Sequence, residues 1–150
     1  MGAVKKIEGY KNYVSIDGGM TDNPRFALYG SPYTVLLANR ASEDYGKDGE
    51  TFTCSVVGRC CESGDLIQEG VKIPKPERGD TIAVLTTGAY NFAMSSNYNA
   101  ICKPPVIMLD GENDYVAVKR ESFDDLISYY RETYFTSDLD VTFLLRDGAT

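Results

Sequence analysis

The stretch from Thr51 to Val57 reads TFTCSVV and is followed by Gly58. Its β-branched and aromatic residues are typical of a β-strand, and the glycine predicts the turn that ends it. A second strand is predicted from Asp65 to Ile73, broken at Gly70. Further along, the nearly continuous apolar run from Thr81 to Thr87 predicts a strand that is buried on both faces.

Outward from this centre, the same signals predict strands at Tyr10 to Asp17, Tyr33 to Asn39, Val106 to Leu109 and Tyr115 to Lys119, with Val141 to Leu145 as a candidate for the last strand. Other segments predict a helical turn from Pro24 through Leu28, a polar loop at Glu43 to Glu50, a short helix with a loop at Gly88 to Asn99, and a hairpin turn at Asp110 to Asn113. A clear helix begins at Ser122, with Asp124 and Asp125 in its first turn. This order predicts a mainly β protein, an antiparallel β-sandwich or barrel with a C-terminal helix.

The composition limits the classes of function. A chain of 150 residues is long enough for one domain with its own core. Its 15 basic and 22 acidic residues give a net charge of −7, and the basic residues are scattered, which argues against binding to nucleic acid or to an anionic membrane. The apolar runs have the length of strands and the N-terminus lacks an apolar signal core. We therefore expect no membrane span and a cytoplasmic location.

The four cysteines are Cys54, Cys60, Cys61 and Cys102. The sequence has no CxxC pair and no histidine, so we expect no metal site. A catalytic cysteine–histidine pair within this chain is excluded for the same reason. In the cytoplasm we expect all four cysteines to be free thiols.

Cys61 and Glu62 are the first candidate site. They follow a predicted strand on a loop bounded by glycines, where a thiol beside a carboxylate presents two proton-handling groups to a ligand. The alternative interpretation is a small buried cysteine beside a solvated glutamate. The spacing alone leaves both interpretations open.

Arg25, Tyr29 and Tyr90 are the other candidates. Arg25 and Tyr29 lie four residues apart after Pro24, so one helical turn would present a guanidinium and a phenol together to a ligand carboxylate. Without other information, a surface arginine and a half-buried tyrosine are the stronger interpretation. Tyr90 follows two small residues and is either a cleft residue or a core tyrosine at a sheet corner. The eight lysines lie in polar or terminal contexts, and none is a candidate for a Schiff base.

Three blocks of sequence, taken in order, resemble the diaminopimelate decarboxylases, pyridoxal-phosphate (PLP) enzymes of lysine biosynthesis. The blocks are Asp17 to Arg25 (DGGMTDNPR) with Leu28-Tyr29, then Val57-Gly58 with Cys61 to Asp65 (CESGD), then Gly79-Asp80 with Gly88-Ala89-Tyr90 and Ser96 to Asn99, and Glu121 to Leu126 resembles the final helix of the family. Ornithine and arginine decarboxylases are similar at Gly-Ala-Tyr, but they have Asp where Glu62 stands. The first block also favours the diaminopimelate branch.

The resemblance implies a parent enzyme of two domains. Its N-terminal half would be a TIM barrel that carries PLP on a lysine, and residues 1–150 would be the C-terminal β-domain, a Greek-key barrel or sandwich like the C-terminal domain of alanine racemases. A barrel takes about 250 residues, so it is absent from this chain, and the isolated domain is expected to be inactive.

The resemblance also implies the role of each candidate in converting meso-2,6-diaminopimelate to L-lysine and CO₂. Cys61 would donate a proton across the interface of a homodimer, and Glu62 would accept the distal ammonium group. Arg25 and Tyr29 would hold the distal carboxylate, and Tyr90 would touch both PLP and the substrate. The alternatives are an ornithine- or arginine-type decarboxylase domain, a non-catalytic β-domain that serves binding or dimerisation, and a plain β-sandwich interaction protein.

Overall fold

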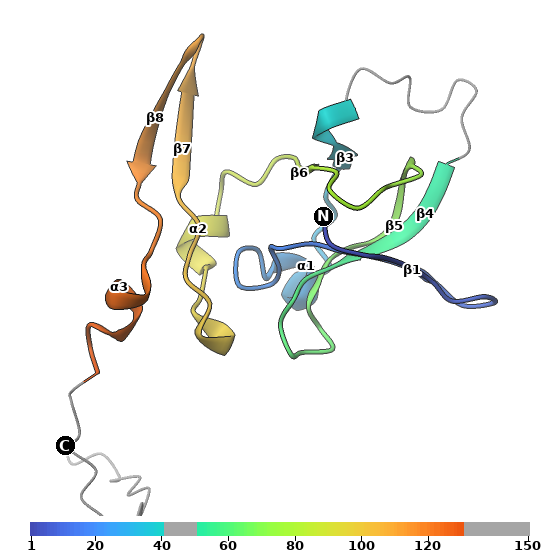
Figure 1. Ribbon diagram of the computed structural model, residues 1–150, viewed down its shortest axis with the longest axis horizontal. Helices are drawn as coiled ribbons and strands as arrows, with labels where there is room; N and C mark the ends of the chain where they lie inside the picture. The colour runs from blue at the N-terminus through green and yellow to red at the C-terminus, as the bar shows by residue number, and fades with distance from the viewer. Residues whose placement is uncertain (41–50, 131–150) are drawn as a thin grey trace, which may run out of the picture.

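The computed structural model describes residues 1–40 and 51–130, which form three separate sheets (Figure 1). The main sheet has the strand order β1-β2-β4-β5 and comprises β1 (Val4–Lys6), β2 (Asn12–Ser15), β4 (Thr51–Val57) and β5 (Leu66–Pro74). β1 pairs with β2 and β4 pairs with β5 in antiparallel fashion, whereas β2 and β4 run parallel, with Tyr13 opposite Ser55. The predicted mainly β fold is confirmed, but the sheet is mixed rather than purely antiparallel.

The predicted break at Gly70 is a bulge and not the end of a strand. β5 continues through this residue, and the β4–β5 register shifts between the pairs Cys54–Val71 and Val56–Gln68. Gly70 has a φ of +66°, a left-handed conformation that glycine adopts without steric cost. The bulge lets one long strand follow the twist of its neighbour.

The second sheet pairs β3 (Val35–Leu37) with β6 (Ile82–Val84), and the short helix η1 (Ala38–Arg40) follows β3. The prediction that the run from Thr81 to Thr87 is buried on both faces is wrong. All three residues of β6 are only half-buried, and Leu85 is 40% exposed. The reason is that β3 also packs against β5 of the main sheet, whereas β6 packs mainly against β3 and η1, so its faces are only partly covered.

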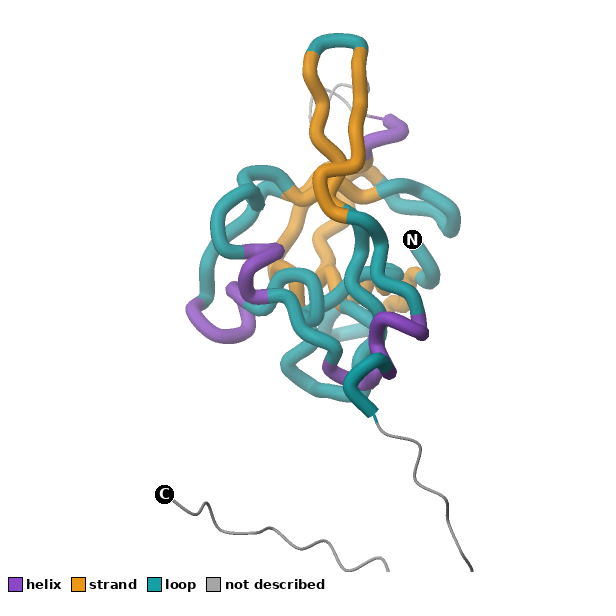
Figure 2. Tube along the Cα trace, turned by 90° about the vertical axis from the view of Figure 1, so that its left-hand side faces the viewer, coloured by secondary structure: helices purple, strands orange, loops and turns teal. Residues whose placement is uncertain are grey.

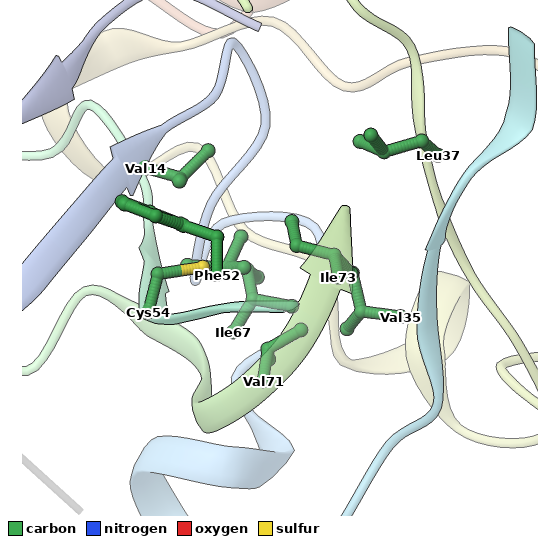
Figure 3. Packing of buried hydrophobic residues seen from close by; sticks show 9 residues of the cluster. Val14, Val35, Leu37, Phe52, Cys54, Ile67, Val71 and Ile73 are labelled. Atoms are coloured by element: carbon green, nitrogen blue, oxygen red, sulfur yellow. The ribbon is translucent and has the colours of Figure 1, made fainter. Parts of the chain in front are cut away.

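The hydrophobic core lies between the main sheet and β3. Its buried side chains come from β2, β3, β4 and β5 and face one another across the two sheets (Figure 3): Val14, Val35, Leu37, Phe52, Cys54, Val56, Ile67, Val71 and Ile73. The sheets form layers and do not close into a barrel over the described residues. This packing fixes the ends of β2, β4 and β6, from which the loops of the candidate site emerge.

The third sheet is a hairpin of β7 (Val106–Asp110) and β8 (Asn113–Val118) that projects from the rest of the chain (Figures 1 and 2). Every residue of β8 is exposed. The helix α3 (Phe123–Ile127) follows and begins with a capping box between Ser122 and Asp125, as the sequence predicts. The predictions for Glu43 to Glu50 and for Val141 to Leu145 lie outside the described residues.

Candidate functional site

The candidate residues lie on or beside three loops that connect the strands. The first site loop covers residues 16–24, between β2 and the helix α1 (Arg25–Tyr29). The second site loop covers residues 58–65, between β4 and β5. The third site loop covers residues 85–105 and includes α2 (Asn91–Met94) and the short helix η2 (Tyr98–Ala100).

Cys61 and Glu62 lie at the exposed tip of the second site loop. The loop turns tightly, because the amide of Glu62 donates to the carbonyl of Cys60 at 2.8 Å and the amide of Asp65 donates to the carbonyl of Glu62 at 3.1 Å. The amide of Cys61 donates to Oδ1 of Asn99, on the third site loop, at 2.8 Å. The interpretation of Cys61 as a buried core cysteine is therefore wrong, since its thiol stands on a fixed and accessible loop.

The Glu62 carboxylate is partly engaged by its own loop. Its Oε1 accepts hydrogen bonds from the amide of Gly64 at 2.9 Å and from the hydroxyl of Ser63 at 3.3 Å. Both bonds are local and exposed, so they orient the carboxylate without neutralising it.

Arg25 begins α1, whose N-cap is Pro24, and the side chain of Asn23 binds the first amide of the helix. Oδ1 of the buried Asn23 accepts from the amide of Arg25 at 3.2 Å and from the hydroxyl of Tyr33 at 3.4 Å. Tyr29 ends the same helix and is 65% exposed, and Gly30 terminates it in a left-handed conformation. Arg25 and Tyr29 are separated by about one helical turn, so both project from one side of α1.

Tyr90 comes from the third site loop and meets Arg25. The guanidinium carbon of Arg25 lies 5.1 Å from the centroid of the Tyr90 ring. Tyr90 is 64% exposed, so the interpretation of it as a core tyrosine is wrong. Among the described residues, four other than glycine have a positive φ, and all lie on this loop: Thr86, Tyr90, Asn99 and Ala100. Such backbone strain is commonly found at functional sites.

Hydrogen bonds join the three site loops into one unit. The carboxylate of Asp65 accepts from the amides of Met20 and Cys60, each at 2.6 Å, and so links the first loop to the second. The amide of Ser96 donates to the carbonyl of Thr21 at 2.9 Å and links the third loop to the first. Together with the bond between Cys61 and Asn99, these contacts connect the loops in a closed ring.

A second set of bonds anchors the third site loop to the chain that leads into α3. One carboxylate oxygen of Glu121 accepts from the side-chain amide of Asn97 and, at 2.8 Å, from the amide of Lys103. The role of Asp65, Asn99 and Glu121 is not predicted by the sequence analysis. The signal available was that Asp65 and Asn99 belong to the quoted blocks CESGD and SNYN.

The electrostatics distinguish the two adjacent thiols. Burial raises the pKa of Cys60, and the negative charge of Asp65 and a hydrogen bond to it raise that pKa further. Burial also raises the pKa of Asp22 in the first site loop, against the opposing effect of the Gly19 amide. Cys60 thus faces inward towards a carboxylate, whereas the neighbouring Cys61 is exposed.

Four of the five predicted site residues are exposed, and the fifth, Arg25, is half-buried. Arg25 and Tyr90 are in direct contact, and the hydrogen-bonded loops connect Cys61 to them through backbone and Asn99. A hollow of about 500 Å³ lies elsewhere, against β2, β4 and β5, and contains none of the five. Within residues 1–40 and 51–130, no group of three or more His, Cys, Asp or Glu side chains is placed to hold a metal ion, and no helix has the length and apolarity to cross a bilayer.

Comparison with known proteins gives consistent matches. Residues 2–88 match the family model described as pyridoxal-dependent decarboxylase, C-terminal sheet domain. The diaminopimelate decarboxylase of Bacillus subtilis is 40% identical over 127 residues, which cover 85% of this chain and 28% of that protein. The diaminopimelate decarboxylase of Staphylococcus aureus is 44% identical over 128 residues, which cover 85% of this chain and 29% of that protein.

Among solved structures, the diaminopimelate decarboxylase of Helicobacter pylori complexed with L-lysine superimposes with a TM-score of 0.72 and 32% sequence identity. The match covers 85% of this chain and 29% of that one. The chain therefore spans less than a third of the length of the relatives that it matches.

Proposed function

We propose that this chain, which belongs to the pyridoxal-dependent decarboxylase family through its C-terminal sheet domain, is the C-terminal part of a diaminopimelate decarboxylase. The complete enzyme would convert meso-2,6-diaminopimelate to L-lysine and CO₂. Residues 1–150 would be its β-domain, and a TIM barrel outside this chain would hold most of the cofactor. The isolated chain would then be inactive, because four of its five candidate residues are exposed and the part of the enzyme that would hold most of the cofactor lies outside this chain.

Arg25 is suited to bind the distal carboxylate of the substrate. Its guanidinium packs against the ring of Tyr90, and among the described residues no carboxylate is paired with it. A planar guanidinium held in this way can donate two parallel hydrogen bonds to a ligand carboxylate. Tyr29, on the same side of α1, adds a phenol hydroxyl as a further donor.

Glu62 is suited to bind the distal ammonium group. A zwitterionic amino-acid end needs one anion and one cation at fixed positions, and Glu62 with Arg25 supplies them. The bond from the Gly64 amide holds one oxygen of the Glu62 carboxylate against its loop. This arrangement would favour a substrate with an amino acid at both ends over one with a bare amine at the distal end.

Cys61 would donate the proton that replaces the lost carboxylate. The chemistry that PLP supplies when bound is electron withdrawal from the carbon whose carboxylate leaves. The exposed ring of Tyr90, set by its left-handed backbone, fits an aromatic cofactor as one contact surface. The Cys61 thiol would release its proton to the former α-carbon, across the interface of a homodimer, and its loop would keep the sulfur in position.

The observation that carries this proposal is that an exposed Cys61–Glu62 loop is hydrogen-bonded to the loops that present Arg25 and Tyr90. The test is CO₂ release by the complete enzyme with PLP, using meso-diaminopimelate, L-ornithine and L-arginine in parallel. We expect release from diaminopimelate only, strongly reduced by Cys61→Ala and retained by the control Cys102→Ala. Preference for ornithine or arginine would support the related decarboxylases instead, and an inactive enzyme would support a binding or dimerisation module.

A further inference from the structure

The buried carboxylate of Asp65 is bonded to both loops that carry the proposed chemistry. Asp65 is only 4% exposed. Its Oδ1 accepts from the amide of Met20 and its Oδ2 accepts from the amide of Cys60, each at 2.6 Å. One amide lies in the loop that leads into Arg25, and the other immediately precedes Cys61. A single side chain therefore bridges two segments that lie forty residues apart in sequence.

Two glycines provide the space for this carboxylate. A Cβ added at Gly58 would lie 2.2 Å from Oδ2 and 2.3 Å from Oδ1 of Asp65, and a Cβ added at Gly19 would lie 2.7 Å from Oδ1. Neither glycine has a φ in the left-handed region, so conformational freedom does not account for them. The close approach of the Asp65 carboxylate accounts for both glycines, because a Cβ atom cannot lie this close to the carboxylate oxygens.

The backbone of Asp65 also closes the base of the second site loop. The amide of Gly58 donates to the carbonyl of Asp65 at 3.0 Å, and the amide of Asp65 donates to the carbonyl of Glu62 at 3.1 Å. The loop that bears Cys61 is thus fixed at its base by backbone bonds and from inside by the carboxylate. On the other side, Met20 adjoins Thr21, whose carbonyl holds the third site loop through Ser96.

We propose that Asp65 is a positioning residue that holds the loop bearing Cys61 in place against the loop that leads into Arg25. This inference rests on the proposed function, in which both of these loops carry residues that act on a substrate. A carboxylate is required because two amide donors need two acceptor oxygens. Asparagine would place its own N–H groups against one of the donors, and glutamate would add a methylene where Gly19 and Gly58 leave no room.

The experiment compares Asp65→Asn with Asp80→Asn in the complete enzyme with PLP. Asp80 is a matched control, because it is 8% exposed and also accepts from a backbone amide, that of Glu77, at 2.8 Å. Its other partners are Asn39 and Arg40, which lie outside the candidate site. Both variants remove one buried carboxylate charge, but only Asp65→Asn removes a carboxylate that bridges two of the site loops.

For Asp65→Asn we expect kcat to fall about 10- to 100-fold and KM for meso-diaminopimelate to rise several-fold, because small misplacements of reacting groups cost rates of this size. Hydrogen–deuterium exchange should become faster in peptides covering residues 18–24 and 58–65. For Asp80→Asn we expect kcat and exchange in these two segments to match the wild type, even where its thermal stability falls. Equal kinetics in the two variants, or unchanged exchange in both segments, would overturn the proposal.

Gly19→Ala provides a milder second variant if Asp65→Asn does not fold. Its added methyl group lies nearest to Oδ1 of the carboxylate, at 2.7 Å, where Met20 is bound, and 3.0 Å from Oδ2. We expect KM to rise more than kcat falls, because the added methyl group displaces the loop that leads into Arg25 before the loop that bears Cys61. Equal effects on KM and kcat would count against the role of Asp65. A wild-type enzyme that releases no CO₂ would contradict the proposed function, while the exchange comparison would still decide whether Asp65 holds the loops.

Discussion

The guanidinium of Arg25 lies over the ring of Tyr90, with 5.1 Å between the guanidinium carbon and the ring centroid. The two residues are far apart in sequence and meet only because the first and third site loops are bonded together through Thr21 and Ser96. Such a contact contributes about 0.5–1 kcal/mol at an exposed site. Its greater effect is to orient the guanidinium plane, which leaves the N–H groups at its edge available to a ligand.

Replacing Arg25 by lysine should separate orientation from charge. Lysine keeps the positive charge but lacks the planar fork, so it can neither bind a carboxylate bidentately nor pack flat against Tyr90. In the complete enzyme we expect KM for meso-diaminopimelate to rise about 10- to 100-fold with a smaller change in kcat, measured by steady-state CO₂ release. Arg78→Lys, on an exposed turn, serves as the control. A KM within twofold of the wild type would contradict the role of Arg25.

Glu62→Gln tests the charge of this side chain without disturbing its loop. The glutamine oxygen can still accept from the amide of Gly64, but the negative charge for the distal ammonium is lost. We expect kcat/KM for meso-diaminopimelate to fall by a double-digit factor, because one unpaired charge costs about 1.5–3 kcal/mol. Kinetics that do not change on this substitution would refute the assignment.

Alkylation should distinguish the cysteines by exposure and by acidity. Iodoacetamide reacts with thiolates, and burial of Cys54, which is 3% exposed, raises the pKa of its thiol to about 11. Peptide mapping of the complete enzyme at pH 8 should therefore show labelling of Cys61 and none of Cys54. Added L-lysine, the proposed product, should slow the labelling of Cys61 and leave that of Cys102 unchanged. Labelling of Cys61 at the same rate with and without lysine would argue that this thiol does not face the substrate.

The strands with strong local patterns could be predicted from the sequence. The segment Thr51 to Val57 matches β4 residue for residue, and Ser122 caps α3, because β-branched runs and capping residues act through neighbours in the chain. The parallel pairing of β2 with β4 could not be predicted, since it depends on which strands become neighbours in space. The exposure of β6 was wrongly predicted for the same reason: an apolar run does not reveal which other elements will cover the faces of its strand.

The same distinction applies to the candidate site. Residue type makes Arg25, Cys61 and Tyr90 candidates and leaves bland alternatives open for each, and only the resemblance to a family assigns them roles. The role of Asp65 could not be predicted from its residue type, because its partners are backbone amides, which every residue except proline possesses. Only the coordinates show that these amides converge on one carboxylate.

The crowding around Asp65 predicts a non-additive pair of substitutions. Gly58→Ala should lower the thermal midpoint of the complete enzyme, because the added methyl group collides with the carboxylate, and overpacking of this kind typically costs about 1–3 kcal/mol. In an Asp65→Ala background the same substitution should have almost no further effect. The measurement is the midpoint in all four combinations, and additive losses would show that Gly58 is required for some other reason.

The stability of the fold should decrease at high pH because of Cys54. The pKa of this thiol is raised by burial from its ordinary value of 9.0 to about 11, so the protonated form is favoured in the folded state. The contribution to stability is fully present below pH 9 and is lost as the pH rises from 9 to 11. We expect the urea midpoint of the wild type to fall more steeply over this interval than that of Cys54→Ala. Parallel pH profiles for the two proteins would contradict this expectation.

The left-handed residues of the third site loop have a consequence for how this domain tolerates mutation. Thr86, Tyr90, Asn99 and Ala100 are all solvent-exposed, and exposed positions usually accept many side chains. At three of these four, Thr86, Tyr90 and Ala100, the native residue is neither glycine nor asparagine, so the native domain already bears a cost of about 1–2 kcal/mol for the backbone conformation of each. A survey of all substitutions would thus find surface positions between residues 86 and 100 at which glycine raises the stability of the domain, whereas a β-branched residue in place of Asn99 lowers it.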